Sequence, residues 1–212
     1  MIEFFAWSLT PRADTAEVAL VTACPTAVAD SVTDAPTAHT LGPEVRARVY
    51  AAVRNCGAHY PSGAFGLYRL GSQEASPLHD LAVAVAVVAA ATNPGWSGLD
   101  HVVFLAELCL DGRLRPADAD TGSIAAITTA VTAAAQAGFR YVVVAAEHTA
   151  HLPPIEGITV LGASTLREVL DWLYSTADPS PKPAGRCSLM WRTPSGHRRD
   201  HRDPTDGHRD HR

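Results

Sequence analysis

The sequence predicts a mixed α/β domain, and three observations lead to this fold class. Hydrophobic residues make up 47% of the 212 residues and charged residues only 18%, so the chain has enough apolar material to bury a core. Segments with strand-like apolar patterns are interspersed with segments of helical periodicity. The length favours one domain, since domains usually contain about 100–200 residues.

Strands are expected where short apolar runs lie between turn-forming residues. The predicted strands cover residues 3–24 (as one or two strands), 64–70, 101–110 (as a buried strand or a hairpin), 141–145 and 158–162. Residues 26–43 are rich in Thr, Ala, Asp and Pro and predict a loop. The dipeptide Asp111-Gly112 predicts a hairpin turn.

Three helices are predicted from their start and stop signals. Pro43 suits the first turn of a helix and Gly57 its C-terminal end. Ser123 and Gly138 predict the ends of the second helix, and Ser164 predicts the N-cap of the third. The apolar run at residues 81–91 is ambiguous, because its valines alternate as in a strand whereas its alanines favour a helix.

Charge divides the chain into two parts. Residues 1–179 carry nine Arg and eighteen Asp or Glu, a net charge of −9, whereas residues 180–212 carry a net charge of +4. An acidic body attracts a phosphate backbone only through a local basic patch. We therefore expect a folded domain over residues 1–176 and a disordered tail over residues 177–212.

The tail is a low-complexity tract of His, Arg and Asp. Its composition is typical of a weak transition-metal chelator or of an Arg-driven nucleic-acid tether, and equally of an extension without a selected role. The weak metal-ligand candidates are His197, His201, His208 and His211. No other metal site and no cofactor is predicted.

Several chemistries lack their residues in this sequence. Lys182 is the sole lysine, so no phosphate-loop lysine and no lysine within the predicted domain exist. The four cysteines show no C-x-x-C spacing. The N-terminal residues lack a secretory pattern, and the longest apolar run has eleven residues, about half of a membrane span. These features predict a cytoplasmic protein that does not insert into membranes.

Four stretches in the same order resemble the N-terminal domain of ComM-type magnesium-chelatase-like proteins. They are residues 46–61, 79–91, 103–116, and 137–148 followed by 157–173, and the most specific piece is ELCLDGRLRP. The C-terminal domain of RadA-type DNA repair ATPases is similar in fewer places. The resemblance implies a Lon-protease-like (ribosomal-protein domain-2-like) fold, in which residues 81–91 form a buried helix.

The resemblance also bears on catalysis. Full-length relatives continue into an ATP-hydrolysing, ring-forming module, and the sequence contains no G-x-x-x-x-G-K-[ST] motif, so we expect a chain that lacks this module. Active proteins with the implied fold use a Ser-Lys dyad, but Asp80 stands near the expected serine and no lysine follows Pro116 in the second segment. Asp80 is expected to be a carboxylate at a helix N-terminus.

Two groups of charged residues are candidate interaction sites. The first group, on the predicted helix before Gly57, is a candidate DNA contact or else a solvated face: Arg46, Arg48 and Arg54. The second group surrounds the Asp-Gly turn and is a candidate docking surface or else an exposed turn with ordinary ion pairs: Glu107, Asp111, Arg113 and Arg115.

The function expected from these features is a non-catalytic accessory or assembly module, with a role in DNA uptake or recombination implied by the resemblance. One alternative is a protein-interaction domain that partners a separate AAA+ ATPase. The other is a residual serine hydrolase that uses Ser76 or Ser123. The oligomeric state is not predicted.

Overall fold

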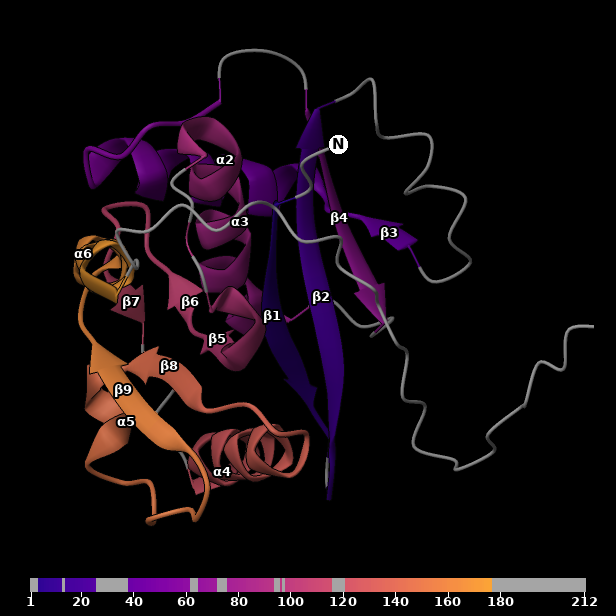
Figure 1. Cartoon of the computed structure of the whole chain (residues 1–212), viewed down its shortest axis with the longest axis vertical. Helices are drawn as coiled ribbons and strands as arrows, with labels where there is room; N and C mark the ends of the chain where they lie inside the picture. Colours follow the sequence, from indigo (N-terminus) through magenta and orange to yellow (C-terminus); the bar gives the residue numbers. More distant parts are fainter. Residues whose placement is uncertain are drawn as a thin grey trace, which may run out of the picture. The chain divides into compact units, whose positions relative to one another are not determined.

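A mixed β-sheet is the centre of the domain in the computed structural model (Figure 1). Within the described residues the sheet has seven strands in the order β3-β4-β2-β1-β5-β8-β9. Their bounds are β1 Phe4–Pro11, β2 Ala16–Pro25, β3 Ala38–Thr40, β4 Phe65–Gly71, β5 Val102–Leu105, β8 Tyr141–Ala145 and β9 Thr159–Ala163. The predicted mixed α/β class is confirmed.

The structure describes residues 4–12, 14–25, 38–61, 65–71, 76–93, 96, 98–115 and 121–176. All of them belong to a unit that spans residues 1–179. The predicted tail over residues 177–212, with its four candidate histidines, lies outside the described residues. Among the helices that are described, none has the length and apolar character needed to cross a membrane.

The two halves of the sheet differ in strand direction. β3, β4, β2 and β1 pair antiparallel with their neighbours, whereas β1, β5, β8 and β9 pair parallel. The carboxyl ends of parallel strands share one edge of a sheet. A small two-stranded hairpin, β6 (Glu107–Leu108) and β7 (Leu114–Arg115), follows β5 at this edge, and β7 contacts β8 (Figure 1).

Helices cover both faces of the sheet because successive strand residues point to opposite sides. Phe104 contributes to a core shared with α2 (Pro43–Asn55), α3 (Asp80–Thr92) and α6 (Leu166–Thr176). Its neighbours Val103 and Leu105 contribute to a second core, against α4 (Thr121–Gln136). The domain is therefore a sheet between two helical layers.

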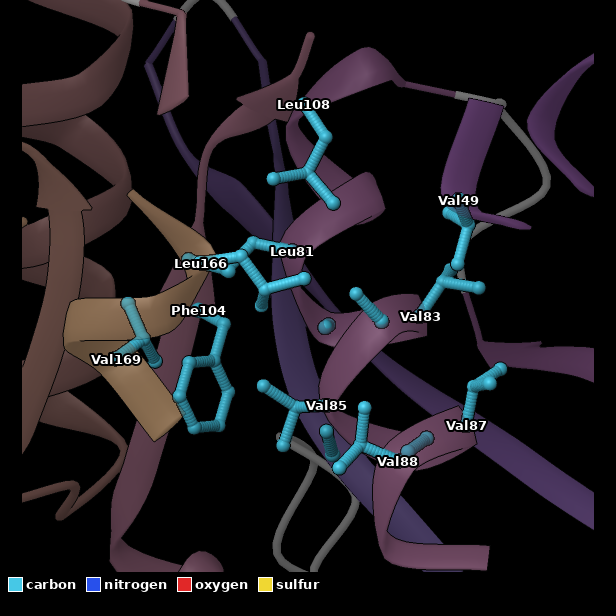
Figure 2. Packing of buried hydrophobic residues seen from close by; sticks show 14 of the residues in the cluster. Val49, Leu81, Val83, Val85, Val87, Val88, Phe104, Leu108, Leu166 and Val169 are labelled. Carbon is cyan, nitrogen blue, oxygen red and sulfur yellow. The ribbon is translucent and has the colours of Figure 1, made fainter. Parts of the chain in front are cut away.

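The central helix α3 explains the ambiguous run in the sequence. All residues from Asp80 to Ala89 are buried, so the helix has no solvent-facing side and shows no amphipathic pattern. Figure 2 shows its valines, Val83 to Val88, among side chains from neighbouring elements, including Val49, Phe104 and Leu166. The helix implied by the family resemblance is confirmed.

Helix ends were predicted correctly at their glycines and incorrectly at two serines. Gly57 and Gly138 have φ of 73° and 88°, the left-handed conformation that favours glycine after a helix. However, α4 begins at Thr121, so Ser123 lies inside the helix. The N-cap of α6 is Thr165 and not Ser164, because Thr165 Oγ1 accepts the Glu168 N–H at 3.2 Å.

One short strand and one short α-helix were not predicted. β3 lies within the segment predicted as a loop, where three residues form an edge strand against β4, with Ala38 opposite Leu70. The helix α5 (Ala146–Thr149) follows β8 directly. Both elements are too short to show a periodicity in the sequence, and β3 is defined by its pairing with a strand about 30 residues away.

Candidate functional site

The start of α3 places a carboxylate inside the domain. A short 3-10 helix, Pro77–His79, precedes α3, and Ser76 Oγ caps it by accepting the Leu78 N–H at 3.3 Å. The Leu81 N–H donates to the Ala106 carbonyl and the Ala106 N–H to the Leu78 carbonyl, each at 3.1 Å. These bonds hold the helix start against the end of β5 and thereby bury Asp80.

Asp80 is the first residue of α3, as expected, and its side chain is 1% exposed. Arg48 from α2 donates to it twice, from Nε to Oδ2 at 2.6 Å and from Nη2 to Oδ1 at 3.1 Å. The Leu108 N–H donates to Oδ2 at 3.3 Å. The guanidinium and the carboxylate thus form a two-pronged ion pair that joins α2, α3 and β6.

Burial and pairing act in opposite directions on this carboxyl group. Burial raises the pKa of Asp80, whereas the hydrogen bonds from Arg48 and Leu108 oppose the rise. The hydrogen bond with Asp80 raises the pKa of Arg48. Arg48 therefore stabilises the charged form of Asp80 inside the domain. A carboxylate enclosed in this way is not accessible to act as a nucleophile or general base on a substrate.

The three arginines proposed for DNA contact have different surroundings. Arg48 is committed to Asp80 and its side chain is 27% exposed. Arg46 donates from Nε to the Leu41 carbonyl at 3.1 Å, and Arg54 is exposed in the last turn of α2. Nucleic-acid contact by this group stays a prediction, in which Arg46 and Arg54 are better placed than Arg48.

The second predicted group does come together on the β6–β7 hairpin. Glu107 and Arg115 form an ion pair of 3.3 Å across the two strands, and Asp111 and Arg113 form one of 2.7 Å at the turn. The backbone N–H and the guanidinium of Arg113 lower the pKa of Asp111. Leu110, which precedes Asp111, is 61% exposed.

The hairpin turn is held by two neighbouring helices, α2 and α6. Gly112 has φ of 86°, and a Cβ at this position would lie 3.3 Å from the Ala52 carbonyl oxygen of α2. Asn55 Nδ2 donates to the Leu110 carbonyl at 2.7 Å, and the Leu166 N–H donates to the Gly112 carbonyl at 2.8 Å. The turn is therefore presented in one conformation, with Leu110 at its tip.

A buried polar pair next to Asp80 was not predicted. His79 is 2% exposed, and its Nε2 lies 3.0 Å from Thr10 Oγ1 on β1. Burial, together with the positive charge of Arg69, lowers the pKa of His79 to about 4. The sequence offered no signal for this pair, because the two residues are 69 positions apart and no pattern links them.

The two serines of the hydrolase alternative are only partly described. Ser76 serves as a helix cap, and the side chain of Ser123 lies outside the described residues. In the part of the chain that the structure describes, no three His, Cys, Asp or Glu side chains gather as for a metal ion.

The part of the chain that matches a known family contains both the Arg48–Asp80 pair and the ion pairs of the β6–β7 hairpin. The family model described as subunit ChlI of Mg-chelatase matches residues 37–148. Uncharacterized proteins of Mycobacterium bovis and of two Mycobacterium tuberculosis strains are each 33% identical in an alignment 178 residues long, and this alignment covers 74% of this chain and 33% of each relative. The chain thus spans about a third of the length of the curated relatives that it matches. By this match over more than half of its residues, from β3 to α5, the chain belongs to the family of subunit ChlI of Mg-chelatase.

Proposed function

We propose that this chain is a non-catalytic assembly module of the ComM-type branch of its family, with a Lon-protease-like fold. In this proposal its β6–β7 hairpin docks on a separate AAA+ ATPase subunit. The cellular role that we assign to such an assembly is DNA processing, as the family resemblance implies. The proposal has two parts, the lack of catalysis and the docking.

The non-catalytic part is supported by the surroundings of Asp80. The resemblance puts the serine nucleophile of active relatives near this position, where this chain has an enclosed carboxylate bonded to Arg48 and to the Leu108 N–H. A nucleophile needs an adjacent base and an open approach for the substrate. The ion pair instead fastens three elements together, which is a structural task.

The docking part is carried by one observation, the exposure of Leu110 on a turn that is already held in place. Side chains that anchor interfaces are apolar or aromatic, surrounded by polar groups, and lose little entropy when their backbone is ordered beforehand. Leu110 precedes Asp111 of one ion pair, a second pair lies further along the hairpin, and the Leu110 carbonyl accepts a hydrogen bond from Asn55. An exposed leucine next to charged pairs suits a partner with a small apolar pocket.

The docking can be tested with the two thirds of a mycobacterial relative that lie outside its match to this chain. We expect the full chain to bind the immobilised segment that lies outside the match, as measured by biolayer interferometry. Leu110→Ala should weaken binding about tenfold, since truncation of an anchor residue costs 1 kcal/mol or more. The matched control is Tyr174→Ala, which removes another exposed apolar side chain, on α6.

Two results would contradict the docking proposal. One is the absence of binding at a chain concentration of about 100 µM, since most specific complexes have dissociation constants below this concentration. The other is equal binding by the Leu110→Ala variant and the unchanged chain. Circular dichroism of both variants shows whether a loss of binding reflects a loss of fold.

A further inference from the structure

A cavity of about 310 Å³ lies beside the hairpin, where the parallel strands β8 and β9 end. It is lined by Arg113 and Arg115 from the hairpin, Ala145 and Ala146 at the end of β8, Glu147 from α5, and Ser164 after β9. Clefts at the carboxyl ends of parallel strands are common ligand sites in α/β proteins. The volume is at the lower end of the range for small-molecule sites.

The guanidiniums of the two arginines that line this hairpin cavity are oriented by carboxylates of residues that do not line it. Asp111 accepts from Nε of Arg113, and Glu107 accepts from Nη1 of Arg115. Within the described residues, no hydrogen bond engages the Nη atoms of Arg113 or the Nε and Nη2 atoms of Arg115. Their side chains are 71% and 57% exposed, so these donors are available to a ligand.

The charge and shape of the lining define the ligand chemistry. Two arginines and Glu147 line the cavity, and the Asp111 and Glu107 carboxylates that pair with the arginines bring these five groups to a net charge of −1. The free guanidinium edges, and not the net charge, would therefore hold an anion. A guanidinium edge carries two parallel N–H donors, which match the two oxygens of a planar carboxylate. A phosphate carries up to two negative charges, and Glu147 would repel it more strongly than it would repel a monovalent carboxylate.

We propose that the hairpin cavity is a carboxylate-binding site, in which Arg113 and Arg115 bind the two oxygens of one carboxylate group. The carboxylate belongs either to a small organic acid or to an Asp or Glu side chain of a protein partner. The site stands on the cavity and its two oriented guanidiniums, so it is independent of the ATPase-docking proposal. A titration with isolated carboxylates tests it without any partner protein.

Nitrogen-15 NMR titration of the full chain distinguishes the two sources. One arm adds glutarate, and the other adds the peptide acetyl-Gly-Glu-Gly-amide, with acetyl-Gly-Gln-Gly-amide as its uncharged match. Chloride keeps the ionic strength constant, and inorganic phosphate is titrated in parallel. We expect saturable shifts of the backbone amides of Arg115, Glu147 and Ser164, with a dissociation constant on the order of 1–10 mM.

Variants with opposite expected effects exclude a mere loss of structure. Arg115→Gln should weaken binding about fivefold to tenfold, because it removes a charged donor. Glu147→Gln should strengthen binding roughly threefold, because it removes a repulsive charge. Arg140→Gln is the matched control. Arg140 is an exposed arginine that precedes the first residue of β8, whereas the cavity lies at the last residue of this strand, so the change should leave binding unchanged.

The outcomes decide both the site and its source. Binding of glutarate but not of the Glu peptide assigns the site to small acids, and binding of the peptide but not of glutarate assigns it to a protein side chain. The proposal is overturned if no shift saturates, if Arg115→Gln and Arg140→Gln bind equally, or if phosphate binds more than about tenfold tighter than either carboxylate.

Discussion

Replacing Arg48 with methionine removes the countercharge of the enclosed Asp80 carboxylate while keeping most of the apolar stem of the side chain. Asp80 would lose two charge-assisted hydrogen bonds and keep one, from the Leu108 N–H. Removing one partner of a buried ion pair costs 3–5 kcal/mol. Because the Arg48 side chain is 27% exposed, water has partial access to the site. We therefore expect a cost near the lower limit, about 3 kcal/mol.

Urea unfolding followed by circular dichroism measures this cost. A domain of this size has a free energy of unfolding of about 5–15 kcal/mol, so Arg48→Met removes a large share of it. The same cost corresponds to a decrease in Tm of about 6–12 °C. The matched control is Arg54→Met, which removes an exposed arginine from the same helix and should change stability by less than about 0.5 kcal/mol.

The pH dependence separates a charge effect from a packing effect. Burial raises the folded-state pKa of Asp80, and without the opposing Arg48 it rises further. The folded variant then takes up a proton at a higher pH than the unfolded chain, so the destabilisation is complete above that raised pKa and shrinks as the pH falls through it. The stability difference between Arg48→Met and the unchanged chain should thus be smaller at pH 5 than at pH 8.

A double-variant cycle completes the test. In an Asp80→Asn background no carboxylate is left without a partner, so Arg48→Met should cost at least about 1.5 kcal/mol less than in the unchanged chain. The reasoning is refuted if Arg48→Met costs less than about 1 kcal/mol, or if it costs the same in both backgrounds.

Three further predictions concern the buried histidine, the hairpin turn and the helix arginines. The pKa of His79 is lowered to about 4, below its ordinary 6.5, so its contribution to stability is present above pH 6.5 and is lost toward pH 4. When the pH falls from 7 to 4.5, the free energy of unfolding measured with urea should decrease by about 2 kcal/mol more for the unchanged chain than for His79→Gln. Equal decreases would contradict the lowered pKa of His79. Gly112→Ala should cost about 1–2 kcal/mol in the same assay, because φ is 86° and the added Cβ meets α2, whereas Gly42→Ala, with open space around it, should cost less. Fluorescence anisotropy should show weak, salt-sensitive DNA binding that Arg54→Gln reduces, and DNA binding that is insensitive to salt and to this change would count against α2 as the contact.

Local chemistry predicted most elements of the fold. Pro43 and Gly57 define the ends of α2 within one segment, and Asp111-Gly112 forms a hairpin turn, as expected from its preference for such turns. Periodicity did not settle α3, because a helix buried on all sides has no polar face to reveal its period. For that element the family resemblance supplied the answer.

The sequence by itself determined the elements whose signals are local, namely the strands other than β3, the helix ends at glycines and the charged hairpin. Tertiary structure alone decided the Arg48–Asp80 pair, because 32 residues separate the two side chains and neither carries a motif that names its partner. It also formed the hairpin cavity, whose lining comes from β7, β8, α5 and the end of β9. The physical reason is that short-range preferences act within one segment, whereas burial and charge pairing depend on which segments the folded chain brings together.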